Sequence, residues 1–296
     1  MTGGRSPAPD GLLVVDKPGG WTSHDVVARC RRLTRTRKVG HAGTLDPMAT
    51  GVLVLGVGRA TRLLGHLALT DKAYEATVRL GASTVTDDAE GDVVEVRDAS
   101  GVTDRALAGA LAALTGSIEQ VPSAVSAVKV DGVRSYARVR AGEGVELAAR
   151  PVVVHRLDVL ARRGDDVDVL AEVSSGTYVR ALARDVGAAL GVGGHLTALR
   201  RTRVGPFGLD RARPLGDLSS DEVVDAAVVR LDDAVAAAFP RRLLDAGEAV
   251  ELSHGRRLAP GGGPGVVGAF APDGRCVALV ADRDGAARPV VVFAPA

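Results

Sequence analysis

The sequence contains few aromatic residues, cysteines or lysines, and these shortages narrow what the protein can be. With one Trp, three Tyr and four Phe in 296 residues, the core has to be filled mainly by Val, Leu and Ala. Two cysteines, Cys30 and Cys276, are too few for a disulfide scaffold, and no C-x-x-C pair is present for zinc binding or redox chemistry. We therefore expect a protein with reduced thiols.

Long apolar runs and metal-binding motifs are also missing. No run of 18 apolar residues occurs, and the first ten residues lack the hydrophobic core of a signal peptide. The six histidines form no H-x-H or H-E-x-x-H cluster, and GVGRAT at 56–61 lacks the Gly-Lys-Ser/Thr ending of a phosphate loop. These absences predict a cytoplasmic protein without a membrane segment, a metal or a nucleotide cofactor.

The composition, 46% hydrophobic and 25% charged, is that of a globular protein with a substantial core. Residues 1–10 are rich in Gly and Pro, and we expect them to form a disordered tail. A large domain is expected over 11–238. A boundary near Phe239-Pro240 then leaves a small module at 239–296, whose three short apolar runs predict β-strands.

Apolar periodicity in the large domain predicts both strands and helices. The expected strands are 11–18, 52–57, 73–81 and two within 151–174 around a charged turn at 162–166. Four helices are expected: one capped by Ser23, one that begins at Thr103, and two that span 177–190 and 221–239. Segment 35–51 is predicted to be a glycine-punctuated loop. An acidic cluster, which comprises Asp87, Asp88, Glu90 and Asp92, is expected to form an exposed, solvated turn.

Positive charge is concentrated locally, although the net charge is only +1. Residues 26–45 include five arginines and Lys38 but no acid, and a second basic segment carries Arg200, Arg201 and Arg203. Each run by itself is compatible with an ordinary solvated surface. Two runs beside a glycine-rich loop favour a track for a phosphate backbone, and arginine, which supplies all but four of the 37 basic residues, binds phosphate in a bidentate manner.

The most unusual segment is the loop KVGHAGTLDPMATGVL at 38–53. Its glycines permit a tight backbone, and the proline after Asp46 restricts the direction of that carboxylate. An Asp-Pro pair also commonly begins an ordinary turn. Taken singly, His41 fits a loop hydrogen-bonding residue better than a ligand. Tyr74 and Tyr178 are each compatible with a core residue, and Arg180 is compatible with a surface residue of its helix.

Five segments in order resemble the TruB family of tRNA pseudouridine-55 synthases over about 11–213. These segments are GLLVVDKPGGWTSHDVV, KVGHAGTLDPMATGVL, DKAYEATVRLG, SSGTYVRALARDVG and HLTALRRTRVGPF. The resemblance implies an α+β fold with a mixed, largely antiparallel central sheet flanked by helices. Residues 240–296 are similar to the small RNA-binding module of the PUA type.

The resemblance also implies roles for individual residues. Asp46 matches the essential aspartate, Tyr74 the tyrosine that stacks on the target base, and Arg180 the arginine that pairs with the aspartate. Other matching or basic residues are expected to bind substrate; they are His41, Tyr178, Leu199, Lys17, Arg35, Arg37 and Lys38. The sequence departs from the family at Val125, where an aromatic residue is frequent, and at Ala42, where Thr is common.

The implied activity is isomerisation of uridine 55, in the T arm of tRNA, to pseudouridine. The target base must leave the RNA stack before a side chain reaches it, and the redox-neutral reaction needs no cofactor. We expect a monomer that binds tRNA. Three alternatives remain open: a related pseudouridine synthase acting on another RNA, a tRNA-folding chaperone without catalysis, and an unrelated α/β hydrolase or binding domain.

Overall fold

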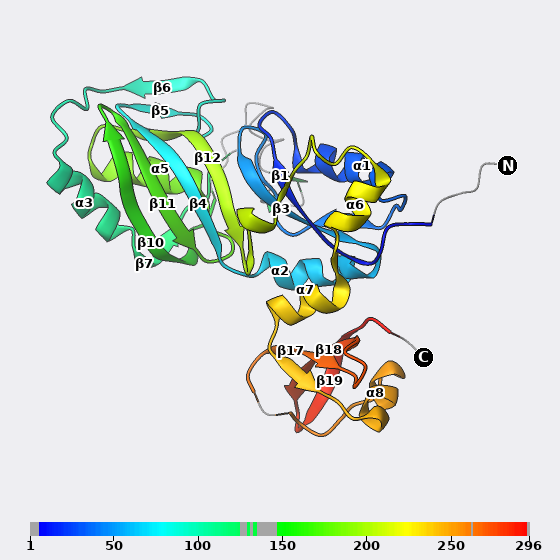
Figure 1. Ribbon diagram of the computed structural model, residues 1–296. Helices are drawn as coiled ribbons and strands as arrows, with labels where there is room; N and C mark the ends of the chain where they lie inside the picture. The colour runs from blue at the N-terminus through cyan, green and yellow to red at the C-terminus, as the bar shows by residue number, and fades with distance from the viewer. Residues whose placement is uncertain (1–5, 125–128, 131–132, 135–146, 262, 295–296) are drawn as a thin grey trace.

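The computed structural model describes residues 6–124, 129–130, 133–134, 147–261 and 263–294 (Figure 1). One sheet dominates the large domain, and its strands run in the order β14-β1-β3-β12-β4-β11-β10-β7. Their bounds are β14 (Arg213–Pro214), β1 (Gly11–Lys17), β3 (Thr50–Val57), β12 (Gly194–Val204), β4 (Lys72–Leu80), β11 (Asp166–Val173), β10 (Arg150–Arg163) and β7 (Gly116–Gln120). Three short strands pair with β3, β12 and β1 of this sheet, respectively: β2 (Val39–His41), β13 (Phe207–Gly208) and β15 (Val229–Arg230).

Within this large sheet most neighbouring strands are antiparallel, and among its described pairs only β1–β14 and β3–β12 are parallel. The predicted α+β fold with a largely antiparallel sheet is therefore confirmed. Two hairpins lie outside this sheet, β5 (Ala82–Thr84) with β6 (Val93–Val96) and β8 (Lys129–Val130) with β9 (Val133–Arg134).

Helices cover one face of the sheet, as Figure 1 shows for α3 (Asp104–Ala113) and α5 (Val179–Ala189). Val78 of β4, Val169 of β11 and Leu182 of α5 share one core cluster with the apolar side of α3. Strand β4 alternates between buried residues on this face and more exposed residues on the other, because successive side chains of a strand point to opposite faces. The alternation was predicted from the sequence.

The other helices lie elsewhere along the chain. They are α1 (Ser23–Leu33), the 3₁₀ helix η1 (Gly58–Leu63), α2 (Leu64–Ala68), the 3₁₀ helix η2 (Leu209–Arg211), α6 (Asp221–Ala227), α7 (Leu231–Ala238) and α8 (Ala246–Ser253). No helix among the described residues has both the length and the apolar character needed to span a bilayer.

The N-cap of helix α1 lies one residue earlier than we predicted. Thr22, not Ser23, is the N-cap, because Asp25 stands three residues after Thr22 and the two form a reciprocal capping box. Ser23 is thereby released for a different contact: its hydroxyl donates to the carbonyl of Leu45 (3.1 Å) and accepts from the Leu45 amide (2.9 Å).

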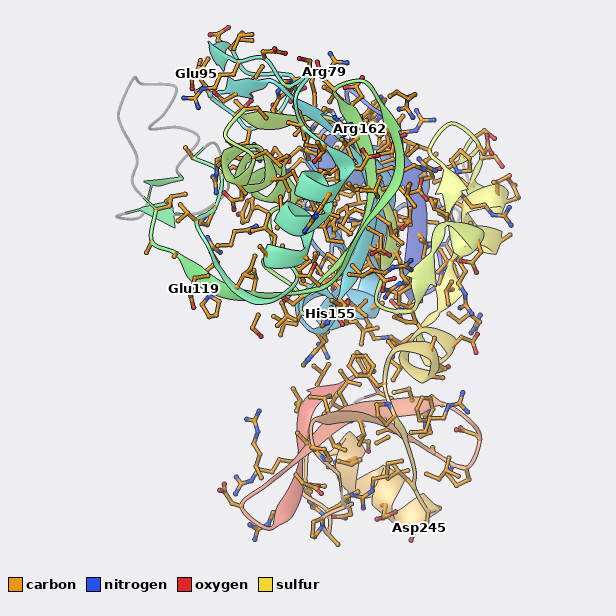
Figure 2. All side chains as sticks on the ribbon, turned by 90° about the vertical axis from the view of Figure 1, so that its left-hand side faces the viewer. Arg79, Glu95, Glu119, His155, Arg162 and Asp245 are labelled. Atoms are coloured by element: carbon orange, nitrogen blue, oxygen red, sulfur yellow. The ribbon has the colours of Figure 1, made fainter. Side chains whose placement is uncertain are left out.

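The C-terminal part forms a four-stranded sheet packed on α8, with strands β16 (Arg241–Leu243), β17 (Val266–Phe270), β18 (Cys276–Arg283) and β19 (Ala286–Val292). Figure 2 shows this module, with Asp245 at its far end, below the large domain. The two are also joined by hydrogen bonds, since Arg59 donates to the carbonyl of Phe293 (2.8 Å). Residues 6–10, which we expected to be disordered, are placed: Ala8 is buried, and its amide donates to the Thr34 carbonyl (3.0 Å).

Candidate active site

The glycine-rich loop between β2 and β3 is held in place by buried polar side chains. Ser23 secures Leu45 from α1, as described above. On the other side, the Arg201 guanidinium donates to the carbonyls of Gly43 (3.1 Å), Thr44 (3.3 Å) and Val52 (2.7 Å). Arg201 is only 1% exposed. These contacts fix the backbone on both sides of Asp46.

Asp46 forms an ion pair with Arg180, the second residue of α5. The Nε and Nη2 atoms of Arg180 lie 3.0 and 3.3 Å from the two carboxylate oxygens of Asp46. The Arg180 side chain is 6% exposed, whereas the Asp46 side chain is 35% exposed. The carboxylate is thus oriented from behind by a permanently charged group and is still accessible from solvent.

The same guanidinium also contacts a second carboxylate. Arg180 Nη1 lies 3.3 Å from Asp88 and donates to the Thr86 carbonyl (2.9 Å). Asp88 in turn accepts hydrogen bonds from the Thr86 hydroxyl and from the Glu90 amide (3.0 Å). One buried cation therefore bridges two carboxylates, and only Asp46 faces the pocket.

The expectation that the acidic cluster is a solvated turn is wrong for Asp87 and Asp88, which are 8% and 3% exposed. The turn is drawn against β12, because the amide of Leu196 donates to the Asp87 carbonyl (3.0 Å) and the amide of Ala89 to the Leu196 carbonyl (2.8 Å). Burial raises the pKa of Asp87. A local run of acids carries no signal for this long-range pairing.

Beside Asp46 lies a pocket of about 270 Å³. Tyr74 of β4 and Leu199 of β12 line it, and both are largely buried, at 7% and 8% exposure. Tyr178 and Arg180 enter from the start of α5. The predicted residues Asp46, Tyr74, Tyr178, Arg180 and Leu199 are thus brought together from four different parts of the chain.

Lys17 lies under the loop and outside the group of side chains that line the pocket. Its ammonium is buried and donates to the carbonyls of Trp21 (2.7 Å), Pro18 (2.9 Å) and Pro47 (3.1 Å), the last of which directly follows Asp46. Burial lowers the pKa of Lys17 to about 8, and the attraction of Asp46 opposes part of that shift. Lys17 is positioned to support the loop.

His41, at the end of β2, is also outside the pocket lining. Its ring meets the ring of His24 edge to face, with 5.6 Å between centroids. The Nδ1 atom is buried without a hydrogen-bond partner among the described residues, and burial lowers the pKa of the imidazole.

One residue that the sequence did not single out positions the start of α5. Gln120, 1% exposed at the end of β7, accepts from the Tyr178 amide (2.8 Å) and donates to the Tyr178 carbonyl (3.1 Å). Tyr178 is the N-cap of α5 and has no side-chain cap of its own. The side-chain amide of Gln120 therefore supplies hydrogen bonds to the backbone at the start of α5. A single glutamine in a strand gives no local indication of this role.

The two basic segments differ in their exposure to solvent. The second segment is not the phosphate track that we predicted: Arg201 is buried, Arg200 is paired with Asp16 (2.6 Å) and Arg203 with Glu172 (3.0 Å). In the first segment, Arg37 and Lys38 are exposed.

Arg35, also expected to bind RNA, is instead half-buried and paired with Asp221 and Asp225, each at 2.9 Å. Of the two departures from the family pattern, Ala42 is fully buried with its amide bonded to the Val54 carbonyl (2.9 Å), and Val125 lies outside the described residues. No group of three His, Cys, Asp or Glu side chains in the described ranges is placed to hold a metal ion.

Two solved structures of complexes contain a chain with the same architecture. A chain in the crystal structure of a Cbf5-Nop10-Gar1 complex superposes with a TM-score of 0.75 and 29% identity over 96% of this chain and 85% of that one. A chain from an H/ACA RNP bound to a substrate RNA containing 2′-deoxyuridine superposes with a TM-score of 0.73 and 27% identity, with coverage of 96% and 85%.

Family models cover nearly the whole described chain. Residues 31–179 match the N-terminal domain of the TruB family pseudouridylate synthases, 180–249 the tRNA pseudouridylate synthase B C-terminal domain, and 239–294 the C-terminal model of tRNA pseudouridine synthase II. The chain therefore belongs to the TruB family of pseudouridylate synthases, and the resemblance stated above is confirmed.

Close relatives extend this match over the full length. A protein of Arthrobacter sp. (strain FB24) is 60% identical, with coverage of 96% of this chain and 97% of the relative. One from Thermobifida fusca (strain YX) is 61% identical, with coverage of 96% and 99%. Both relatives bear the name tRNA pseudouridine synthase B.

Proposed function

We propose that this protein converts the uridine at position 55, in the T arm of tRNA, to pseudouridine, and that Asp46 is its essential carboxylate. The observation that carries the proposal is the accessible Asp46 carboxylate, held by buried Arg180 beside a pocket walled by Tyr74. The names of the relatives support tRNA as the substrate.

The reaction exchanges one bond of the base for another. The C1′–N1 bond breaks, a C1′–C5 bond forms, and one proton moves from C5 to N1 in net terms, so that no electrons are gained or lost. The base must be flipped out of the RNA to enter the pocket. The ring of Tyr74 offers the extruded base a new stacking partner, which is worth about 1–3 kcal/mol.

Each step of this scheme is assigned to a side chain that the structure places at the pocket. Asp46 acts on the sugar or the ring during bond cleavage, and Arg180 orients its carboxylate through two contacts. Asp88 limits how far the guanidinium can turn toward Asp46, because it holds the opposite side of the same group. The hydroxyl of Tyr74 is assigned removal of the C5 proton. The pocket walls keep water away from the detached base.

RNA recognition is assigned to the exposed basic surface that follows α1 and to the C-terminal module. Arg37 and Lys38 are exposed on the same segment that leads into the catalytic loop, which suits contacts with the phosphate backbone near the target base. We propose 11–238 as the catalytic domain, 239–296 as a PUA-like RNA-binding module, and 1–10 as a tail. The protein acts as a cytoplasmic monomer in this proposal.

The test is incubation of wild-type protein and Asp46→Asn with unmodified tRNA, followed by chemical mapping of pseudouridine. We expect the wild type to modify position 55 alone. Asp46→Asn should form no product and should bind tRNA within a few-fold of wild type, because the substitution keeps the size of the side chain.

Other outcomes would favour the alternatives. Product at another site, or only in a different RNA, would assign the enzyme another substrate. Product formation by Asp46→Asn would remove this carboxylate from its role. A wild type that accelerates tRNA folding and yields no pseudouridine would indicate a chaperone.

A further inference from the structure

Two further cations line the pocket beside the Asp46–Arg180 pair: Lys72 of β4 and Arg201 of β12. Both lie against the same glycine: a Cβ atom built on Gly43 would lie 3.6 Å from Lys72 Cε and 3.7 Å from Arg201 Nη1. The part of the pocket lining beside Gly43 is therefore cationic.

Backbone oxygens, rather than carboxylates, hold both cations. The Lys72 ammonium donates to the carbonyls of Ala68 (2.9 Å) and Thr70 (2.8 Å), and Arg201 donates to two carbonyls of the loop and one of β3. Neither cation forms a salt bridge with a carboxylate in the part of the chain that the structure describes. An ammonium has three N–H donors, so Lys72 keeps one for a group that enters the pocket.

The Lys72 ammonium is buried beside a second cation. Lys72 is 7% exposed, and burial together with the nearby Arg201 lowers the pKa of its ammonium to about 8, while Asp71 opposes the shift. A buried ammonium with a perturbed pKa that lines a pocket, as Lys72 does and Lys17 does not, is a candidate functional group.

We propose that Lys72, with Arg201 behind it, is a catalytic residue that donates a hydrogen bond to a uracil carbonyl oxygen as the base detaches from the sugar. The inference rests on the proposed function. When the C1′–N1 bond breaks, its electron pair stays on the base and spreads from N1 onto O2 and O4. Lys72 remains protonated and stabilises this charge until C5 returns the electron pair to C1′, C5 loses its proton and N1 gains one.

The position of Lys72 on the strand supports this assignment. Lys72 precedes Tyr74 by two residues, so both side chains lie on the same face of β4. In this proposal, a uracil stacked on the Tyr74 ring has its edge toward the Lys72 ammonium. Arg201 is opposite Tyr74 in the β12–β4 register and extends the cationic wall.

The experiment compares two substrates that differ in how readily the base leaves. T-arm RNA is prepared with uridine or with 5-fluorouridine at position 55, and single-turnover loss of the original nucleoside is followed for wild type and Lys72→Met. Fluorine withdraws electrons, so that detached 5-fluorouracil needs less stabilisation. We expect the variant to be slowed roughly 100-fold on uridine, as for removal of one donor to a developing oxyanion, and about 10-fold or less on 5-fluorouridine.

A phosphate contact would give a different pattern. Equal slowing on both substrates, or a loss that lies in RNA affinity and its salt dependence, would overturn the inference. Lys38→Met is the matched control: this exposed lysine should affect RNA binding only, and the rate ratio between the two substrates should stay at the wild-type value.

Two further measurements keep the result interpretable. Lys72→Arg retains the positive charge, so it should recover part of the rate and move the alkaline loss of activity to higher pH, whereas Lys72→Met should not recover. The Lys72 variants are needed for this assignment because the pKa of Lys17 is also lowered to about 8. If wild type forms no pseudouridine at position 55, the proposed function fails; if it does and the substrate ratio is unchanged in Lys72→Met, only the role of Lys72 fails.

Discussion

Two arginine-rich segments of this chain, 29–38 and 200–203, look alike in sequence and have different uses. The first continues from the exposed side of α1 into a loop, where Arg37 and Lys38 face solvent. The second lies in β12, an interior strand with β3 on one side and β4 on the other. A run of positive charge in a sequence therefore predicts an exposed basic surface only when the element that carries it is open to solvent.

The alternation of β12 explains the fate of its arginines. Arg200 is opposite Glu75 and lies on the open face, whereas Arg201 is opposite Tyr74 and lies on the core face. A register shift between Arg201 and Arg203 then places Arg203 beside Glu172 on the open face. All three arginines contact other groups of the protein, and Arg201 holds the backbone of the catalytic loop.

The largest effect that separates the two segments is expected for Arg201→Met. The substitution leaves the carbonyls of Gly43, Thr44 and Val52 without their donor, which should lower the free energy of unfolding by about 3 kcal/mol and abolish activity. Arg200→Met on the same strand removes a half-exposed ion pair and should cost about 1 kcal/mol or less. Denaturant unfolding measures both, and equal losses would contradict the distinction.

An intermediate effect is expected for reversal of the exposed charges, Arg37→Glu with Lys38→Glu. If these side chains contact phosphates, tRNA affinity should fall at least 10-fold and the salt dependence of binding should become shallower, by about one unit of slope per lost contact. Arg203→Glu serves as the comparison, since Arg203 is already paired with Glu172. Binding titrations over a range of salt concentrations provide the test, and an unchanged slope in the double variant would return residues 37–38 to an ordinary solvated surface.

The smallest effect contrasts a buried lysine with an exposed one. Because the pKa of Lys17 is lowered from 10.5 to about 8, the unfolded chain binds more protons than the folded chain between these values, and Lys17 should make stability rise with pH in that window. Lys17→Met should flatten this rise, whereas Lys38→Met should leave it intact. Unfolding curves collected from pH 7.5 to about 10.5 compare the slopes; a rise of equal slope in all three proteins would show that Lys17 does not titrate there.

Much of the local structure was predictable because it depends on neighbouring residues. The apolar run of β1, the alternation of β4 and the two strands of 151–174 are all present in the structure. The cap of α1 was misassigned by one residue because Thr22 and Ser23 are both good caps, and the partner at Asp25 decides between them. Segment 35–51, predicted to be a loop throughout, also contributes β2 and the first residues of β3.

The candidate site also contains residues that the sequence predicted and residues that it did not. Asp46, Tyr74 and Arg180 were named from motifs, and the structure brings all three to one pocket. Asp88 and Gln120 were missed, since each acts through a partner that is about 60 to 90 residues away in the chain. Burial of an acid or an amide depends on what packs over it, and a single sequence does not contain that information.

The sequence by itself determined where many strands and helices lie, because periodicity and turn chemistry act over a few residues. Its motifs determined the family, and the family resemblance implied the type of sheet and the site residues. Only the tertiary structure decided which charged side chains are buried or paired within the protein. A buried cation is tolerated where distant carbonyls or carboxylates meet it, as at Arg201 and Arg180. Such meetings depend on strand order and register, and these arise from packing of the whole sheet.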